Sequence, residues 1–276
     1  MDLKLPQTTQ KRIVIIGGGF AGMNVALKLK NSNFQIVLLD KHNYHTFQPL
    51  LYQVATGGLE PTSIAYPLRK LIKNQPNVYF RLANVEQIST DKKVVITDIG
   101  ELNYDVLVIA IGTTTNFFNL PEESTSKMKT LKSIPQALDL RSYILENFEN
   151  ALLEEDLDAK KALMNISIVG GGPTGVELAG AIAEMKSHML PGDYKELNLN
   201  KMQVHLFEAS GNLLGPMSKD SQKRAVEYLD KFGVNIHLNT AVKSYTKGQL
   251  VYGEDESLMT ETVIWTAGVK GAYLPG

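Results

Sequence analysis

The chain contains 276 residues with a formal net charge of −1, of which 43% are hydrophobic and 21% charged. This length suggests about two domains, and the composition is that of a globular protein. The near-neutral charge gives no electrostatic reason to expect nucleic acid as a partner. No apolar run approaches the ~18 residues of a membrane-spanning helix, and the opening "MDLKLPQTTQ" lacks the apolar core of a signal peptide.

Cysteine is absent from the 276 residues. These residues therefore offer no disulfide, no thiolate nucleophile and no cysteine-ligated zinc or iron–sulfur site. The five histidines do not show metal-type spacing with partner ligands. The sequence predicts no metal site.

The first recognisable motif is "RIVIIGGGFAGMNVALKLK", which begins at Arg12. An apolar run is followed by glycines in G-x-G-x-x-G spacing (Gly17, Gly19 and Gly22) and then by a helical pattern. A second apolar run, "QIVLLD", ends at Asp40, 18 residues later (40 − 22). In such a unit the glycines permit a tight turn, approach of a pyrophosphate and close helix packing, and the acid accepts hydrogen bonds from a ribose.

The same pattern occurs a second time, offset by 153 residues (170 − 17). "ISIVGGGPTGVELAGAIAE" contains Gly170, Gly172 and Gly175, and "QVHLFE" ends at Glu208. The longer spacing of 33 residues (208 − 175) predicts an insertion, which "MLPGDYKELNLNKM" at 189–202 explains. A single glycine motif is weak evidence, but the repeated order of strand, loop, helix and acid predicts a duplicated nucleotide-binding unit.

Two dinucleotide sites in one chain suggest one bound flavin and one exchangeable nicotinamide nucleotide. The alternative is two unrelated Rossmann domains with independent ligands. In the second unit, Ala209 and Ser210 follow Glu208, and the next basic residue is Lys219. A 2′-phosphate would meet a carboxylate without a local cation, which favours NADH over NADPH.

The remaining pattern sets the organisation of the chain. Strands are predicted near 12–16, 35–39, 78–82, 93–97 and 105–111, and near 166–169, 203–207, 234–238 and 262–266. Residues 113–135 read as a linker between the units. Ser133 and Gln136 fit a capping box that opens a helix over 135–153. The charged run that follows, 154–161, reads as a solvated loop.

Four segments, "GGGFAG", "QPLLYQVATG", "GGGPTGVELAG" and "WTAGVKG", resemble those of type II NADH:quinone oxidoreductases, which are single-subunit flavoproteins that do not pump protons. The resemblance covers the whole chain. It implies an α/β fold with two Rossmann-like dinucleotide-binding domains, the NADH domain being inserted into the FAD domain. The implied domains are a first part of the FAD domain (1–118), the NADH domain (119–270) and a return to the FAD domain (271–276).

The resemblance also implies cofactor-binding residues. Non-covalent FAD would contact the first glycine loop, the following acid, an adenine-side residue and the end of a later strand: Gly17, Gly19, Phe20, Ala21, Gly22, Asp40, Lys41, Gln48, Val85, Ala110 and Gly112. NADH would contact the second loop and its partners: Gly170, Gly172, Pro173, Thr174, Gly175, Glu177, Glu208, Ala267 and Gly268.

Three residues are implied at the reaction site: Glu177, Gln48 and Gly57. Glu177 would lie near the nicotinamide and the flavin; alternatively, it is simply a favourable residue near a helix N-terminus. In "HTFQPLLYQVATG" (45–57), helical periodicity predicts that Phe47, Leu50, Leu51 and Val54 pack in the core. Gln48, Gln53, Thr56 and Gly57 are the candidates to approach the flavin or the quinone.

The implied reaction takes a hydride from NADH to FAD and passes two electrons to a membrane quinone. The absence of cysteine fits this reaction, since relatives that reduce disulfides need redox cysteines. Two alternatives stay open: an NADH-dependent reductase of a ferredoxin- or rubredoxin-type carrier, and a non-enzymatic NADH-binding sensor or interaction module. The implied location is cytoplasmic, peripheral on the inner face of the cell membrane, and a homodimer is compatible with the family.

The chain stops at Gly276, whereas the family continues with a Gly-Asp flavin motif, quinone-site residues and membrane-binding helices. The Gly-Asp pair present here, Gly192-Asp193, lies in the insertion of the second unit. We therefore expect a fragment that binds flavin weakly, reduces quinone poorly, and contacts the membrane surface only through the missing region.

Overall fold

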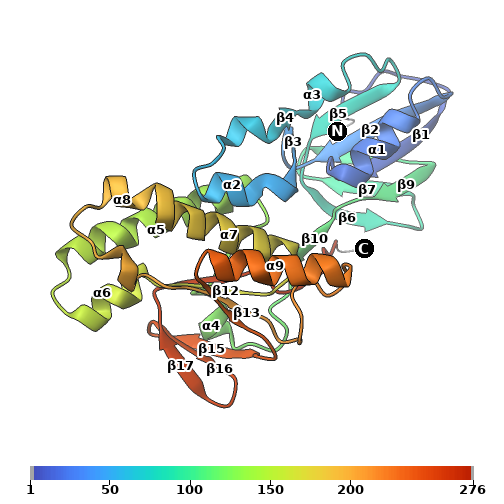
Figure 1. Cartoon of the computed structure of the whole chain (residues 1–276). Coiled ribbons are helices and arrows are strands. Elements are labelled where there is room, and N and C mark those ends of the chain that lie inside the picture. Colours follow the sequence, from blue (N-terminus) through green and yellow to red (C-terminus); the bar gives the residue numbers. More distant parts are fainter. Residues whose placement is uncertain (1–2, 275–276) are drawn as a thin grey trace. The chain divides into compact units, whose positions relative to one another are not determined.

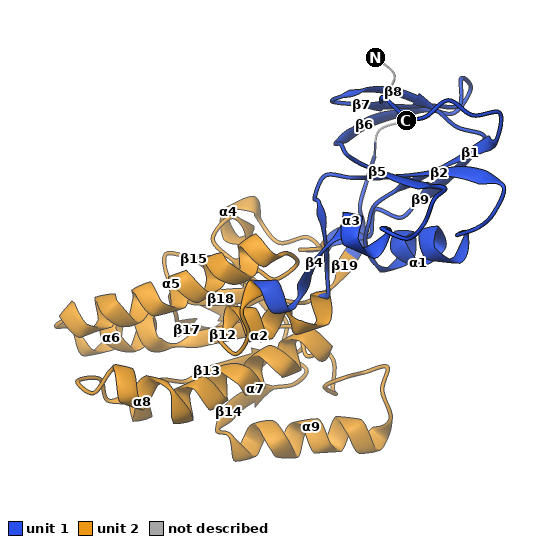
Figure 2. Cartoon of the chain, turned by 90° about the horizontal axis from the view of Figure 1, so that it is seen from above, with its two compact units in different colours: residues 1–47, 62–114, 270–276 blue, residues 48–61, 115–269 orange. Residues whose placement is uncertain are grey.

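The computed structural model describes residues 3–274 (Figure 1). The chain divides into two compact units (Figure 2). Unit 1 comprises Met1–Phe47, Thr62–Thr114 and Lys270–Gly276, and unit 2 comprises Gln48–Pro61 and Thr115–Val269. Unit 2 is thus inserted within the sequence of unit 1, as the resemblance implied.

Unit 1 is built on a parallel sheet with the strand order β5-β2-β1-β9. Its strands are β1 (Lys11–Ile16), β2 (Phe34–Asp40), β5 (Val78–Leu82) and β9 (Val106–Ile109), and α1 (Phe20–Lys28) connects β1 to β2. Successive residues of β1 and β2 enter two different core clusters, one of which includes residues of α1. Because both faces are covered, these strands read as unbroken apolar runs rather than as alternating patterns.

An antiparallel meander covers one of those faces. It consists of β6 (Val85–Ser89), β7 (Val94–Thr97) and β8 (Gly100–Asn103), and Val95 and Leu102 pack against Val14 and Val37 of the sheet. The sequence predicted only the central strand of this meander, because β6 and β8 are short and carry polar residues on their exposed face. The other elements of unit 1 are β3 (Tyr44–Thr46), β4 (Ala65–Pro67) and α3 (Leu68–Leu71), and the 3-10 helix η2 (Pro61–Ser63) bridges the unit boundary.

Unit 2 repeats the architecture with the strand order β11-β18-β12-β13-β14. Its parallel strands are β11 (Lys129–Thr130), β18 (Thr262–Trp265), β12 (Ile166–Val169), β13 (Val204–Phe207) and β14 (Val234–His237). Helix α7 (Pro173–His188) packs on β12, β13 and β14, and α9 (Lys219–Lys231) packs on β14. The other face carries the meander β15 (Val242–Thr246), β16 (Gln249–Tyr252) and β17 (Glu256–Met259), which the sequence did not predict.

One of the remaining helices of unit 2 was expected to be a loop. Helix α5 (Ile134–Leu153) confirms the predicted helix, and Ser133 Oγ accepts the Gln136 N–H at 3.4 Å. The predicted loop at 154–161 is wrong beyond its first residues, because α6 (Leu157–Met164) begins there. Asp156 caps α6 by accepting two backbone N–H groups, so the acidic run is a helix start rather than a loop. The short elements are α4 (Glu122–Thr125), α8 (Leu190–Asp193) and η3 (Leu199–Lys201).

Two short strands, β10 (Thr113–Thr115) and β19 (Val269–Gly271), pair where the chain passes between the units. The unit boundaries at 114/115 and 269/270 lie close to the expected domain limits of 118 and 270. The expected division differs at residues 48–61, which it assigned to the first domain and which the structure groups with unit 2.

Residues 45–57 do not form one helix. The 3-10 helix η1 (Gln48–Leu50) precedes α2 (Leu51–Ala55), which packs against α5 and α7 of unit 2. Leu51 and Val54 are buried as predicted, but Phe47 is 45% exposed and its place in the core was a wrong prediction. Phe47 instead contacts the ring of Phe20 edge to face, with centroids 5.6 Å apart.

A pair of neutral histidines bridges two strands of unit 2. His205 Nδ1 lies 3.1 Å from His237 Nε2, and His205 Nε2 lies 3.1 Å from Gln203 Oε1. Because a carbonyl oxygen only accepts, His205 donates to Gln203 and accepts from His237. Burial, with a smaller effect of the neighbouring His237, lowers the pKa of His205 to about 4. Burial also lowers the pKa of His237, against the opposing charge of Glu256.

This pair predicts acid sensitivity of unit 2. An unfolded histidine binds a proton near pH 6.5, whereas folded His205 does so near pH 4. The contribution of His205 to the free energy of unfolding is therefore fully present above pH 6.5. It is lost as the pH falls toward 4, with a slope of at most ~1.4 kcal/mol per pH unit for each proton. Denaturant unfolding at pH 5.0–7.5 measures this slope, and His205→Gln should flatten it. An unchanged slope in His205→Gln would assign the acid sensitivity to other groups.

Candidate dinucleotide sites

In unit 1 the three motif glycines of the first loop differ in whether the surrounding protein leaves room for a side chain. Gly17 has φ +103°, and a Cβ there would overlap the carbonyl oxygen of Ala110. A Cβ at Gly22 would overlap the carbonyl oxygen of Gly17. At Gly19, in contrast, a Cβ would meet no protein atom within 4 Å. Contacts within the protein therefore require glycine at the first and third positions, whereas the second glycine faces open space.

Unit 2 shows the same division. Gly170 has φ +112°, and a Cβ there would lie 2.6 Å from the Ala267 nitrogen. A Cβ at Gly175 would overlap the carbonyl oxygen of Gly170, and a Cβ at Gly172 would again meet nothing within 4 Å. Open space at the second glycine is what a closely approaching pyrophosphate requires. The residues of both loops therefore fit a dinucleotide.

The backbone frame around the two loops is equivalent. The first glycine of each loop donates to the end of the second strand, Gly17 to Leu39 at 2.8 Å and Gly170 to Phe207 at 2.7 Å. The residue after the neighbouring strand closes the other side. Ala110 donates to Ile16 O, and Thr266 donates to Val169 O, both at 2.8 Å. Ala110 and Ala267 thus lie against the loops.

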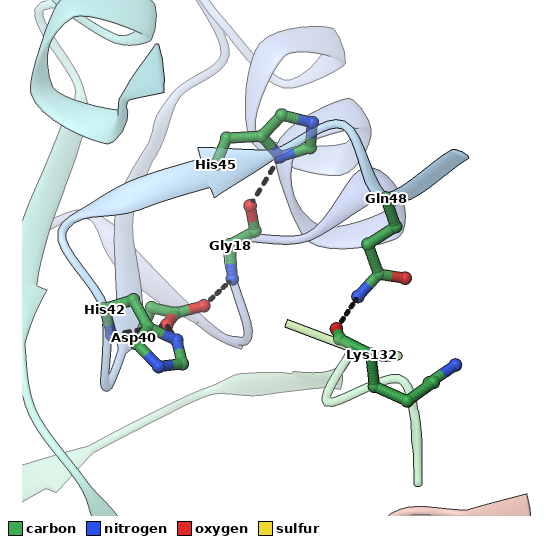
Figure 3. A network of polar contacts seen from close by, with 6 residues as sticks. All are labelled: Gly18, Asp40, His42, His45, Gln48 and Lys132. Atoms are coloured by element: carbon green, nitrogen blue, oxygen red, sulfur yellow. Dashed lines mark hydrogen bonds and ion pairs between the residues drawn. The ribbon is translucent and has the colours of Figure 1, made fainter. Parts of the chain in front are cut away.

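The predicted acids bind the loops directly. In unit 1, Asp40 Oδ2 accepts the Gly18 N–H at 2.5 Å and Oδ1 accepts the His42 N–H at 2.7 Å (Figure 3). In unit 2, Glu208 Oε2 accepts the Gly171 N–H at 2.7 Å and Oε1 accepts the Ser210 N–H at 2.8 Å. Each carboxylate oxygen keeps a second lone pair that can accept a ribose hydroxyl.

Gly18 and Gly171 are site residues that sequence reasoning missed. Each is the unspecified residue between the first two motif glycines, and each donates its N–H to the acid. A Cβ would lie 2.8 Å from Leu68 at Gly18 and 2.6 Å from Leu213 at Gly171. The signal available in the sequence was the unbroken triplet "GGG", which occurs in both loops.

Both loops lead into a helix whose first N–H groups are available to an anion. Gly19 caps α1 and Gly172 caps α7, and neither cap residue supplies a side-chain hydrogen bond. Neither described helix has an acidic residue in its first turn. Unpaired N–H groups and the helix dipole favour a phosphate at these positions. The exposed residues Phe20, Ala21, Pro173 and Thr174 follow the caps.

The other residues expected to contact FAD differ in how exposed they are. Val85 is 9% exposed, and its side chain belongs to the core, which leaves its backbone as the part able to face a ligand. Lys41 is exposed beside Asp40. Gly112 has φ +74°, a backbone conformation that favours glycine. Near the loop, His45 Nδ1 lies 3.0 Å from the Gly18 carbonyl (Figure 3), and the His45 ring contacts Phe20.

The three residues implied at the reaction site lie on unit 2. Desolvation by the surrounding protein raises the pKa of Glu177, although its side chain reaches the surface of α7. Gln48 Nε2 donates to the Lys132 carbonyl at 3.4 Å (Figure 3), which ties η1 to the start of α5. Gly57 has φ +76° and lies near Met189, so its backbone explains the glycine without a ligand. The hydroxyl of Thr56 donates to Tyr52 O at 3.0 Å and closes α2.

Within residues 3–274, no group of three or more His, Asp or Glu side chains could hold a metal ion. Among the same described residues, no helix combines the length and apolar character needed to cross a bilayer.

Two matched glycine loops, each with a helix start and an acid bound to the middle glycine, define a dinucleotide-binding architecture. The sequence profile of the pyridine nucleotide-disulphide oxidoreductase family matches residues 11–273. The chain belongs to this family.

Within the family, the chain is similar to type II NADH:quinone oxidoreductases, which confirms the resemblance. The enzyme Ndh of Mycobacterium tuberculosis is 35% identical over 271 residues, covering 95% of this chain and 58% of the relative. The Staphylococcus aureus enzyme is 28% identical, covering 96% of this chain and 66% of the relative. The structure of NDH2 from Plasmodium falciparum in complex with NADH superposes with a TM-score of 0.89 at 25% identity, covering 96% of this chain and 56% of that chain.

The chain thus spans little more than half the length of several relatives. The sulfide:quinone oxidoreductase of Aquifex aeolicus, at 20% identity and a TM-score of 0.75, shares the fold.

The loop geometry predicts which glycines can be replaced. Gly172 has φ −75° and open space, so Gly172→Ala should keep or raise stability by ~0.4–1 kcal/mol through the unfolded chain. Gly175→Ala places a methyl group against the Gly170 carbonyl and should cost roughly 2 kcal/mol or more. Urea unfolding of the two variants measures the difference. Equal losses would show that Gly172, too, is required by the protein fold.

Proposed function

We propose that this chain is the dinucleotide-binding part of an FAD-dependent NADH:quinone oxidoreductase that acts without proton pumping. One observation carries the proposal: two loops with the same hydrogen-bond frame each leave open space at the second glycine. The names of the relatives support quinone as the final electron acceptor. Bound FAD would supply the redox chemistry by accepting a hydride and releasing two electrons.

Unit 1 is assigned to FAD. The N–H groups at the start of α1 would hold the pyrophosphate in the space beside Gly19. Asp40 would accept hydrogen bonds from the adenosine ribose while it keeps the Gly18 N–H in place. Ala110 and Gly112, after β9, would close the far side of the loop.

Unit 2 is assigned to NADH. The loop of Gly170, Gly172 and Gly175 and the start of α7 would hold the pyrophosphate. Glu208, 37 positions from Gly171 yet bonded to it, would accept the ribose hydroxyls. A carboxylate at this position repels a 2′-phosphate, which favours NADH over NADPH.

Glu177, Gln48 and Gly57 are assigned to the reaction site. The raised pKa of Glu177 makes it able to exchange a proton closer to neutral pH than a solvated glutamate. Gln48 would position the segment before α2 through the Lys132 carbonyl. Gly57, at the end of that segment, would line the path to the acceptor.

We further propose that the full-length protein is cytoplasmic and peripheral on the inner face of the cell membrane, where cytoplasmic NADH and a membrane quinone can both reach it. We also propose that the full-length protein forms a homodimer, as the resemblance to the family allows.

A second candidate is an NADH-dependent reductase of a ferredoxin-type carrier. The fold permits it, since a ferredoxin reductase from Rhodopseudomonas palustris superposes with a TM-score of 0.71 at 16% identity. The segment at 47–57, which resembles the quinone-reducing family, favours quinone.

Dinucleotide binding by unit 2 is tested first. Calorimetry with the 276-residue chain should show NADH binding. The affinity for NADPH should be lower than that for NADH by about tenfold or more. Gly172→Ala should weaken NADH binding at least tenfold, because the added methyl group enters the pyrophosphate space. Gly19→Ala is the matched control in unit 1 and should leave NADH affinity unchanged. If both variants behaved alike, the assignment of NADH to unit 2 would be wrong.

The acceptor is tested in the full-length protein. Purified holoenzyme should oxidise NADH with a short-chain quinone faster than with a ferredoxin-type carrier. Gln48→Ala should lower quinone turnover by about tenfold while the unfolding midpoint stays near that of the parent, because Gln48 positions a loop rather than the core. Glu60→Gln, an exposed change in the same segment, is the control. Faster turnover with the carrier protein would select the second candidate.

A further inference from the structure

A strained and exposed aromatic residue lies at the carboxyl end of the unit 2 sheet. Phe118 has φ +53°, a conformation that bulky residues rarely adopt. Its side chain is 64% exposed. Its N–H donates to Asn116 Oδ1 at 2.9 Å, which holds the backbone in this conformation. Strained backbone that neighbouring groups maintain is concentrated at ligand sites.

The surroundings fix where the Phe118 ring lies. A Cβ at Gly268 would be only 2.6 Å from Phe118 Cζ, so the ring rests directly on the Gly268 backbone. Trp265 Nε1 donates to the Asn116 carbonyl at 2.9 Å and anchors the preceding turn. The adjacent Phe117 packs against Trp265 in the core, with centroids 5.6 Å apart. The Phe118 ring also meets the Trp265 ring edge to face, with centroids 6.5 Å apart, but most of the side chain stays exposed. Phe117 is therefore the aromatic residue that packs this turn onto the core, whereas Phe118 lies at the edge of the core with its ring open to solvent.

Strand order places this ring relative to a dinucleotide. Helix α7 carries the chain from β12 to β13, whereas β18 lies on the opposite side of β12. Dinucleotides bind across such a switch point at the carboxyl ends of the strands. Glu208 follows β13 and marks the adenosine half. The other half of the dinucleotide must then extend toward the end of β18, where Gly268 and Phe118 lie.

We propose that Phe118 is a nicotinamide-side contact of unit 2, whose ring packs against the planar nicotinamide of NADH. The inference rests on the proposed NADH site. It accounts for the positive φ, the exposed ring and the glycine beneath it, because an aromatic face held outside the core is ready to take a planar ring. Offset or edge-on aromatic packing adds to simple apolar burial.

ADP-ribose separates this contact from the rest of the site, because it carries the adenosine, pyrophosphate and ribose but lacks nicotinamide. We would measure NADH and ADP-ribose binding to the parent chain, Phe118→Leu and Phe118→Tyr. Phe118→Leu should weaken NADH about tenfold, or ~1.4 kcal/mol, and change ADP-ribose less than twofold. Phe118→Tyr keeps the ring and should bind NADH like the parent. Leu153→Ala, which removes another exposed apolar side chain of unit 2, should change neither ligand.

Several outcomes decide the question. Equal weakening of NADH and ADP-ribose in Phe118→Leu would make Phe118 a structural residue of the loop and overturn the proposal. Unchanged NADH affinity in Phe118→Leu, or a loss in Phe118→Tyr as large as in Phe118→Leu, would also overturn it. If the parent chain bound neither ligand, the NADH site itself would fail, and that result is distinct from the others. Thermal unfolding of each variant confirms that the binding data refer to folded protein.

Discussion

The close contact between the first and third glycines of each loop is the constraint on which both sites depend. A Cβ at Gly22 or Gly175 would overlap the carbonyl oxygen of the first glycine, so the helix can begin only because that atom is absent. The contact brings the start of each helix against the end of the first strand. The unpaired N–H groups therefore face the same edge as the acid that ends the second strand. Every assignment of a phosphate or ribose follows from this geometry.

The two units reach the same arrangement with different side chains. Aspartate in unit 1 and the longer glutamate in unit 2 both accept the N–H of the middle glycine. Leucines from separate segments, Leu68 and Leu213, fill the space beside those glycines. The carboxylate thus has a structural role in the loop as well as free lone pairs for a ligand. Removing its charge would disturb loop and ligand together, which is why replacing the open glycine tests binding more cleanly.

The sequence predicted the parallel strands, the glycine loops and the acids well, because buried parallel strands give unbroken apolar runs. It did not predict the outer strands of the unit 1 meander or any strand of the unit 2 meander, because these short strands depend on the sheet they cover. The grouping of residues 48–61 with unit 2 arises from contacts of α2 with α5 and α7, more distant in sequence than any local pattern extends. Gly18 and Gly171 were missed although the triplet "GGG" marks both, because the motif leaves the middle position unspecified. Phe118 was missed because a positive φ has no compositional signature.

The family name includes disulphide chemistry, yet the 276 residues contain no cysteine. A redox disulfide therefore cannot be supplied from within these residues, and the dinucleotide loops are the chemistry-bearing features that remain. Both loops are alike in frame, so selectivity between the two nucleotides must come from groups outside the glycines. In unit 2 the groups that we propose for that role are Glu208 on one side of β12 and the turn carrying Phe118 on the other. At Gly112, the matching glycine of unit 1, a Cβ would meet no atom of the described residues within 4 Å, so none of their rings covers it as Phe118 covers Gly268. Such a difference is what would distinguish an exchangeable nicotinamide nucleotide from a resident cofactor.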